Sequence, residues 1–301
     1  MITVVIAIFL IAGSLSLLVA YAVTFNRLRK KETMSHLFMK IIVLLMLATT
    51  FTAVYAVCNF WVIKDYASDT LQTGLLVSQS FAYAMFDSFY STAHWLFAFE
   101  YFSIGKVIPL ALKGIKLSAE TQRMYQNIKM VVITANILTA FLTAVFLCIG
   151  NISQIKKGTV DKVIKITYAT LNLLNYSMLV ACGIFILYAV FSIGKYMRKG
   201  LRPAQINAKN LYLHTVTFLL FTLGLIVEEA FFLIWVIDPN AKKFDRYMVA
   251  AFVAAIFNYL SSMLLCWIIY QYGERKDMPT LLSEGEIDVR ASIDSAKSAK
   301  S

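Results

Sequence analysis

The sequence predicts an all-α membrane protein, a bundle of seven transmembrane helices, and three observations lead to that fold class. Hydrophobic residues make up 59% of the chain and charged residues only 15%. A soluble domain instead carries about 45–50% apolar residues and about 25% charged residues. The mean hydropathy is +0.70. Seven apolar runs are each long enough to cross a hydrocarbon core of about 30 Å, which takes about 20 helical residues.

The seven predicted spans fill most of the chain and leave no room for a separate soluble domain. They lie at about 2–25, 41–63, 73–102, 129–149, 166–193, 211–237 and 247–271. We therefore expect one transmembrane domain over residues 1–273. The remaining segment, 274–301, is polar, rich in Ser and short of aromatic residues, so it is expected to be a disordered cytoplasmic tail.

The distribution of basic residues predicts the orientation of the bundle. Of the 28 Lys and Arg residues, 20 follow the first, third, fifth and seventh spans, and 8 follow the second, fourth and sixth. Cytoplasmic loops carry the excess of Lys and Arg, so the N-terminus is predicted outside and the C-terminus in the cytoplasm. The net charge of +11 then lies mainly on the inner face, where it attracts an anionic leaflet. The sequence predicts no basic soluble domain, which is the feature that would indicate nucleic-acid binding.

The pentapeptide FSIGK occurs twice, at 102–106 and 191–195, each time after a long apolar run. Both copies fall where a predicted helix reaches the cytoplasm. Gly commonly ends a helix in the left-handed conformation, and Lys suits the negative end of the helix dipole. We therefore expect the two copies to mark helix ends rather than a duplicated unit.

Three acidic residues inside the predicted spans suggest a functional site. Asp87 lies about halfway through the third span, and Glu228 and Glu229 lie in the outer half of the sixth. An ionised carboxylate at the centre of a membrane helix costs about 2.5–3.5 kcal/mol on insertion scales, so it usually faces a bundle interior or a wet cavity. Ser91 and His94 fall on the same helix face as Asp87, and this face is expected to point inward.

Polar residues of two further spans are predicted to converge on the same cavity, which opens to the outside. Asn172 and Asn175 form a stripe with Tyr168 in the outer third of the fifth span, and Asn258 lies near mid-depth in the seventh. Together with Asp87, Ser91 and the two glutamates, these asparagines are the candidate ligand-binding residues. Each asparagine also has a structural interpretation, because polar side chains often link helices inside membranes.

The balance of charge narrows the ligand that such a cavity would hold. Only His94 and His214, with Lys165 at the rim, offset the three acids. Ionised carboxylates would make the cavity negative and favour an organic amine or a metal cation. Burial and the mutual repulsion of the adjacent glutamates instead favour a bound proton, with one or more carboxyl groups neutral.

Asp87 and His94 also have simpler interpretations. The carboxylate of Asp87 can bond to Ser91 or to His94 and hold helices together. His94 is a candidate proton relay, but its position next to Trp95 near the inner half of the span favours a role in helix packing.

The octet His94-Trp95-Leu96-Phe97-Ala98-Phe99-Glu100-Tyr101 resembles a His-Trp-x-Phe-Ala-x-x-Tyr segment in helix three of seven-helix membrane proteins of ciliated protists. The resemblance covers this octet and the layout of the spans, and it implies no activity. The topology is only generally similar to that of G-protein-coupled receptors, because the sixth and seventh spans lack proline and Glu100-Tyr101 does not match the acid-Arg-Tyr signature of rhodopsin-like receptors.

Cysteine usage and short motifs leave several alternatives open. Cys58 and Cys148 lie near the outer ends of their spans, where a disulfide and two free buried thiols are both compatible with the sequence. Asn151-Ile152-Ser153 is a glycosylation sequon in a segment predicted to be an outer loop. No metal-ligand spacing of Cys and His and no Gly-rich phosphate loop occur, so no metal and no cofactor are predicted.

These features predict a receptor-like protein with an outward-facing acidic cavity that binds a cationic or protonatable small ligand and signals to a cytoplasmic protein. The alternatives are a proton- or cation-coupled transporter and a structural subunit of a membrane assembly. Catalysis is not expected, because Asp87 has no partner Asp in another span. The segment 277–282 fits an acidic dileucine pattern, so the plasma membrane and endosomal membranes are the expected locations.

Overall fold

The computed structural model describes residues 2–29, 36–63, 69–111, 119–157, 162–197, 208–237 and 244–272, and each of these ranges is one α-helix. In chain order the helices are α1 (Ile2–Arg29), α2 (His36–Ile63), α3 (Asp69–Ala111), α4 (Ala119–Lys157), α5 (Lys162–Met197), α6 (Ala208–Ile237) and α7 (Phe244–Tyr272). The predicted tail at 274–301 lies outside the described residues.

Each predicted span falls inside one of these helices, and some helices extend well beyond it. The largest difference is in α4, which covers Ala119–Lys157 where the span was predicted at 129–149. Its first turns read AETQRMYQNIK and consist mainly of residues with high helix propensity. Hydropathy therefore locates the part of the helix that suits a membrane and misses the turns that continue into the polar layer.

Six of the seven described helices are long and apolar enough to cross a membrane, and α3 is the exception. The chain is therefore a multi-pass membrane protein whose described residues are all helical. The apolar character of α3 is interrupted by polar residues such as Ser80, Asp87, Ser91 and His94. This helix nevertheless lies within the bundle, where it packs against α2, α4 and α5.

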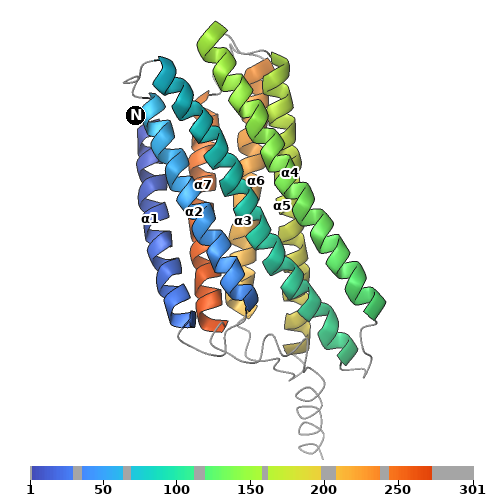
Figure 1. Cartoon of the computed structure of the whole chain (residues 1–301). Coiled ribbons are helices and arrows are strands. Elements are labelled where there is room, and N and C mark those ends of the chain that lie inside the picture. Colours follow the sequence, from blue (N-terminus) through green and yellow to red (C-terminus); the bar gives the residue numbers. More distant parts are fainter. Residues whose placement is uncertain are drawn as a thin grey trace, which may run out of the picture.

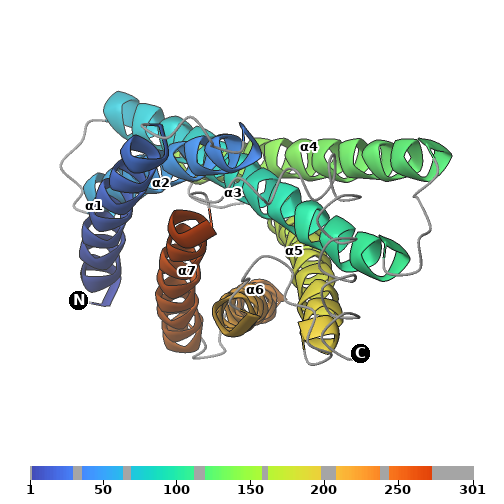
Figure 2. The ribbon, with the colours of Figure 1, turned by 90° about the horizontal axis from the view of Figure 1, so that it is seen from below.

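The helices alternate in direction and form a closed ring with one helix outside it (Figures 1 and 2). Around the ring, the packed neighbours are α1 with α2, α2 with α3, α3 with α5, α5 with α6, α6 with α7, and α7 with α1. The remaining helix, α4, packs on the outside of α3 and α5. The inward faces of α3, α5 and α6 therefore meet on one side of the ring.

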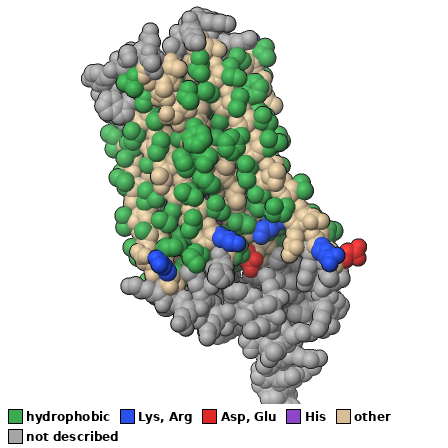
Figure 3. Space-filling model, in the orientation of Figure 1, with side chains coloured by type: hydrophobic (Ala, Val, Ile, Leu, Met, Phe, Trp, Pro, Cys, Tyr) green, Lys and Arg blue, Asp and Glu red, His purple; other side chains and the backbone are tan. Residues whose placement is uncertain are grey.

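The outer surface of the bundle is apolar over most of its length, as Figure 3 shows. Large side chains such as Val19 and Val131 are 64% and 68% exposed. Exposed apolar surface on this scale indicates contact with a non-aqueous environment, here lipid. Basic side chains gather at one end, formed by the ends of α1 and α5 and the starts of α2, α4 and α6, and include Arg29, Lys40 and Arg123.

The prediction that FSIGK marks helix ends is wrong for both copies. α3 continues past residues 102–106 to Ala111, and α5 continues past residues 191–195 to Met197. A Cβ atom at Gly194 would meet no atom of the described residues within 4 Å, so close packing among them does not require this glycine. The repeat marks the approach to the basic end of the bundle rather than the last residue of a helix.

The cysteine and glycosylation predictions also change with the structure. Cys58 and Cys148 are free thiols, so the disulfide alternative is wrong and the alternative of unpaired cysteines holds. Asn151 lies in the last turns of α4 and not in a loop, because α4 extends beyond its apolar part. Its side chain is partly exposed.

Candidate functional site

The polar residues of α3 face the interior of the bundle, as their spacing predicts. Ser80, Asp87, Ser91 and His94 are each at most 4% exposed. Residues three, four or seven apart lie on one side of a helix, so α3 presents a continuous polar stripe to its neighbours. This stripe is the starting point of the candidate site.

The carboxylate of Asp87 pairs with α5. The side-chain amide of Asn175 donates a hydrogen bond to Oδ2 of Asp87. The hydroxyl of Ser91 instead donates to the backbone carbonyl of Asp87, at 2.6 Å, and Nδ1 of His94 lies 2.9 Å from the carbonyl of Tyr90. The alternative in which Asp87 bonds to Ser91 or His94 through its side chain is therefore wrong, although Asp87 does link two helices.

A second carboxylate, from α6, pairs with the same helix. The amide of Asn172 donates to Oε2 of Glu229 at 3.1 Å, and its oxygen accepts a hydrogen bond from the Tyr83 hydroxyl at 3.0 Å. The hydroxyls of Tyr83 and Tyr176 lie 2.8 Å apart. Two asparagines one turn apart on α5 therefore hold one carboxylate from α3 and one from α6.

We call this group the acidic cluster and define it by six residues on three helices. Its members are Tyr83 and Asp87 on α3, Asn172, Asn175 and Tyr176 on α5, and Glu229 on α6. Asp87, Glu228 and Glu229 all lie within electrostatic range of the Tyr176 hydroxyl group. The structure thus brings together most of the residues that the sequence singled out.

Two oxygen atoms of the acidic cluster are buried without a hydrogen-bond partner among the described residues. They are Oε1 of Glu229 and Oδ1 of Asn175. Glu229 is 5% exposed and Asn175 fully buried, so water at the surface does not reach them. Both atoms can accept a hydrogen bond, and a buried polar atom left without a partner costs about 1–3 kcal/mol. The site therefore suits a cation or a hydrogen-bond donor.

Glu228 differs from its neighbour in burial. It is half-buried, because consecutive residues of a helix point about 100° apart. Its charge still interacts with Tyr55 of α2 and Tyr168 of α5. Glu228 thus contributes negative potential at the edge of the acidic cluster, whereas Glu229 lies inside it.

Two histidines lie deeper in the bundle and form a separate group. The rings of His94 and His214 are 5.9 Å apart between centroids, and both side chains are fully buried. Nδ1 of His214 lies 3.0 Å from the carbonyl of Ser261, and Phe218 stacks on His94 at 4.5 Å. No hydrogen bond among the described residues connects His94 to Asp87, so the proton relay stays a prediction and packing explains its position.

Asn258 does not join the acidic cluster. It lines a different pocket, between α1, α2, α3 and α7, and its Oδ1 accepts a hydrogen bond from Ser262. The prediction that Asn258 and Asp87 converge used only their similar depth in the membrane. Depth does not determine which side of a helix a residue occupies, and the two side chains face different neighbours.

Sequence reasoning missed two members of the acidic cluster, Tyr83 and Tyr176. Each lies four residues from a residue that was recognised, Asp87 in α3 and Asn172 in α5. The same helical spacing therefore carried the signal. Tyrosine in a membrane helix is common at interfaces, and this general preference obscured the internal role.

Within the described ranges, no three side chains of the His, Cys, Asp and Glu types gather closely enough to hold a metal ion. No protein-family model matches the chain, and no curated protein sequence matches it. The function must therefore be inferred from the geometry of the acidic cluster.

Proposed function

We propose that the chain is a seven-span, receptor-like membrane protein whose acidic cluster binds a cationic or protonatable small ligand. The observation that carries the proposal is the unpaired, buried oxygen Oε1 of Glu229. A carboxylate held at one oxygen by Asn172 and free to accept at the other is suited to a positive charge. Intramembrane acids face a functional site by default.

The orientation in this proposal places the N-terminus outside and the basic end of the bundle in the cytoplasm. Glu229 lies eight residues before the end of α6 at Ile237, which corresponds to about 12 Å of helix. A ligand from outside would therefore meet Glu229 first and Asp87 deeper, near the middle of the third span. The half-buried Glu228 would attract cations at the entrance.

The signal in this proposal passes through α5. Asn175 bonds to Asp87 of α3 and Asn172 bonds to Glu229 of α6, so a cation that competes for either carboxylate changes how α5 pairs with both helices. A ligand shifts a conformational equilibrium only by its difference in affinity for the two states. The state in which both asparagines hold the carboxylates is the one that the ligand would disfavour.

Thermal unfolding of the purified protein tests the proposal with defined probes. Alkylammonium chlorides from methylammonium to tetramethylammonium are titrated at fixed ionic strength, with sodium chloride as the reference. We expect at least one of them to raise the unfolding midpoint of the wild type, since a ligand at 100 times its Kd adds about 2.7 kcal/mol. Glu229→Gln should abolish the shift.

The matched control is Glu120→Gln, which removes the same charge from an exposed site in the first turn of α4. This variant should keep the full ligand shift. The proposal fails if no ammonium ion stabilises the wild type more than sodium does, or if Glu229→Gln responds like the wild type.

Proton-coupled transport is a second candidate, favoured by one observation. Titratable groups continue from Glu229 and Asp87 to His94 and His214, all of them buried, and such groups mark proton pathways in membrane proteins. Proton flux into proteoliposomes distinguishes the two functions. Flux that Asp87→Asn abolishes would establish transport and contradict the receptor.

A further inference from the structure

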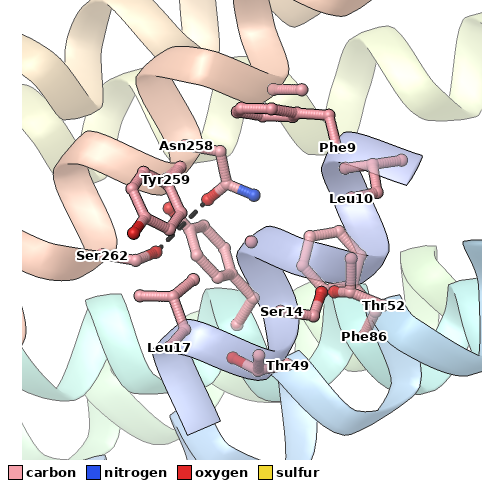
Figure 4. Close-up of a pocket in the computed structure, with 13 residues that line it drawn as sticks. Phe9, Leu10, Ser14, Leu17, Thr49, Thr52, Phe86, Asn258, Tyr259 and Ser262 are labelled. Atoms are coloured by element: carbon pink, nitrogen blue, oxygen red, sulfur yellow. Dashed lines mark hydrogen bonds between the residues drawn. The ribbon is translucent and has the colours of Figure 1, made fainter. Parts of the chain in front are cut away.

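A small pocket lies between α1, α2, α3 and α7 (Figure 4), whereas the acidic cluster joins α3 to α5 and α6. The pocket is only partly enclosed by α1, α2, α3 and α7, and its volume is about 30 Å³. Phe86 and Tyr90 form its α3 wall, on either side of Asp87 in the sequence. A cavity needs a volume of about 10–15 Å³ to hold one water molecule, so this pocket has room for one or two water molecules.

A molecule bound in this pocket could form a hydrogen bond with the hydroxyl group of Tyr90. Tyr90 is 3% exposed and lines the pocket. Its hydroxyl lies near Ser261 and Ser262 but reaches hydrogen-bond geometry with no described group. A buried hydroxyl without a partner is unfavourable, so the pocket calls for a ligand that can bond to it.

Other groups around the pocket complete a neutral hydrogen-bonding site. The side-chain amide nitrogen of Asn258 points into the space between the helices, while its oxygen is engaged by Ser262 (Figure 4). The hydroxyls of Thr49 and Thr52 donate to carbonyls of their own helix, so their oxygens remain acceptors. None of the described residues that line this pocket is charged.

We propose that the pocket binds one or two internal water molecules, which bond to the Tyr90 hydroxyl and the Asn258 amide and connect α7 to α1, α2 and α3. Buried water typically makes two to four hydrogen bonds with groups that would otherwise be unsatisfied, and the pocket offers both donors and acceptors. A cation is disfavoured, because the described lining of the pocket contains no carboxylate. Asn258 thus belongs to a hydration site that is separate from the ligand site.

A double-mutant cycle distinguishes a wet pocket from a dry one. Ala255→Val adds methyl groups at a residue that lines the pocket, and Tyr90→Phe removes the hydroxyl group. If the pocket holds water, Ala255→Val displaces it and leaves the Tyr90 hydroxyl without a hydrogen-bond partner. The thermal unfolding midpoint should then fall by a few degrees. In the Tyr90→Phe background the same change should be neutral or stabilising, since no hydroxyl needs water.

Equal effects of Ala255→Val in the two backgrounds, whatever their sign, would overturn the proposal. A direct measurement on the wild type guards against variants that fail to fold. Water-to-methyl cross-relaxation in labelled protein should reach the methyl group of Ala255 but not that of Ala254, which faces Gly224 of α6. The absence of a water signal at Ala255 would likewise overturn the proposal.

Discussion

The hydrogen bond between Asn175 and Asp87 gives the sharpest prediction about the acidic cluster. Asn175→Leu replaces the amide by an apolar group of similar size and leaves the Asp87 carboxylate buried without its donor. Both side chains are almost inaccessible, at 0% and 4% exposure, so water cannot substitute. An orphaned buried group costs about 1–3 kcal/mol, and more when it is charged. We expect the free energy of unfolding to fall by about 2 kcal/mol.

The double variant Asp87→Leu/Asn175→Leu identifies the cause of that loss. When both partners become apolar, no buried polar group is left without a hydrogen-bond partner. The free energy of unfolding should then return close to that of the wild type. The coupling energy is then about 1–2 kcal/mol, at the upper end of values measured between membrane helices. Unfolding in mixed micelles of denaturing and native detergent measures all four proteins of the cycle.

Asn136→Leu is the matched control for this cycle. Asn136 is also fully buried, but its amide donates to the carbonyl of Val132 within α4 and faces no carboxylate in that bond. Its replacement should cost much less than that of Asn175. A coupling energy within about 0.5 kcal/mol of zero, the range for independent sites, would refute the assignment of Asn175 as the partner of Asp87.

Three further predictions concern packing and cysteine chemistry. Gly183→Val should destabilise the protein by about 1–3 kcal/mol, because a Cβ at Gly183 would clash with the side chain of Leu219. Gly194→Ala, where a Cβ would meet no described atom within 4 Å, should be neutral or slightly stabilising in the same unfolding assay. Arg27→Gln should cost about 0.5–1 kcal/mol through loss of the contact with the Tyr270 ring, 4.0 Å from the guanidinium, and Arg27→Lys should retain part of it. Mass spectrometry of the unfolded, unreduced protein after thiol alkylation should find all four cysteines modified; a disulfide-linked pair would contradict the structure.

Much of the fold follows from the sequence, because a membrane span requires a long apolar helix. The sequence predicts the helix boundaries less accurately. The first turns of α4 before residue 129 are polar but have high helix propensity, so the helix begins well before its apolar part. The same limit explains why FSIGK was interpreted as a helix end.

The candidate site was predicted in part, and the errors have one physical origin. Spacing along α3 correctly placed Asp87 and Ser91 on a buried face, since periodicity fixes the relative direction of side chains in one helix. It says nothing of how neighbouring helices are rotated. Asn175 was therefore recognised without its partner, and Asn258 was assigned to a cavity that it does not share with Asp87.

The pairing of the buried polar groups bears on the alternative that they only hold helices together. A purely structural role would be served best by groups that satisfy one another completely, because every unpaired buried atom lowers stability. The acidic cluster leaves Oε1 of Glu229 and Oδ1 of Asn175 without partners among the described residues. The polar stripe also leaves α3 short of the apolar character that the other six described helices have. Helix packing alone does not account for these two unpaired oxygens, whereas the cation that we propose between α3, α5 and α6 would bond to them.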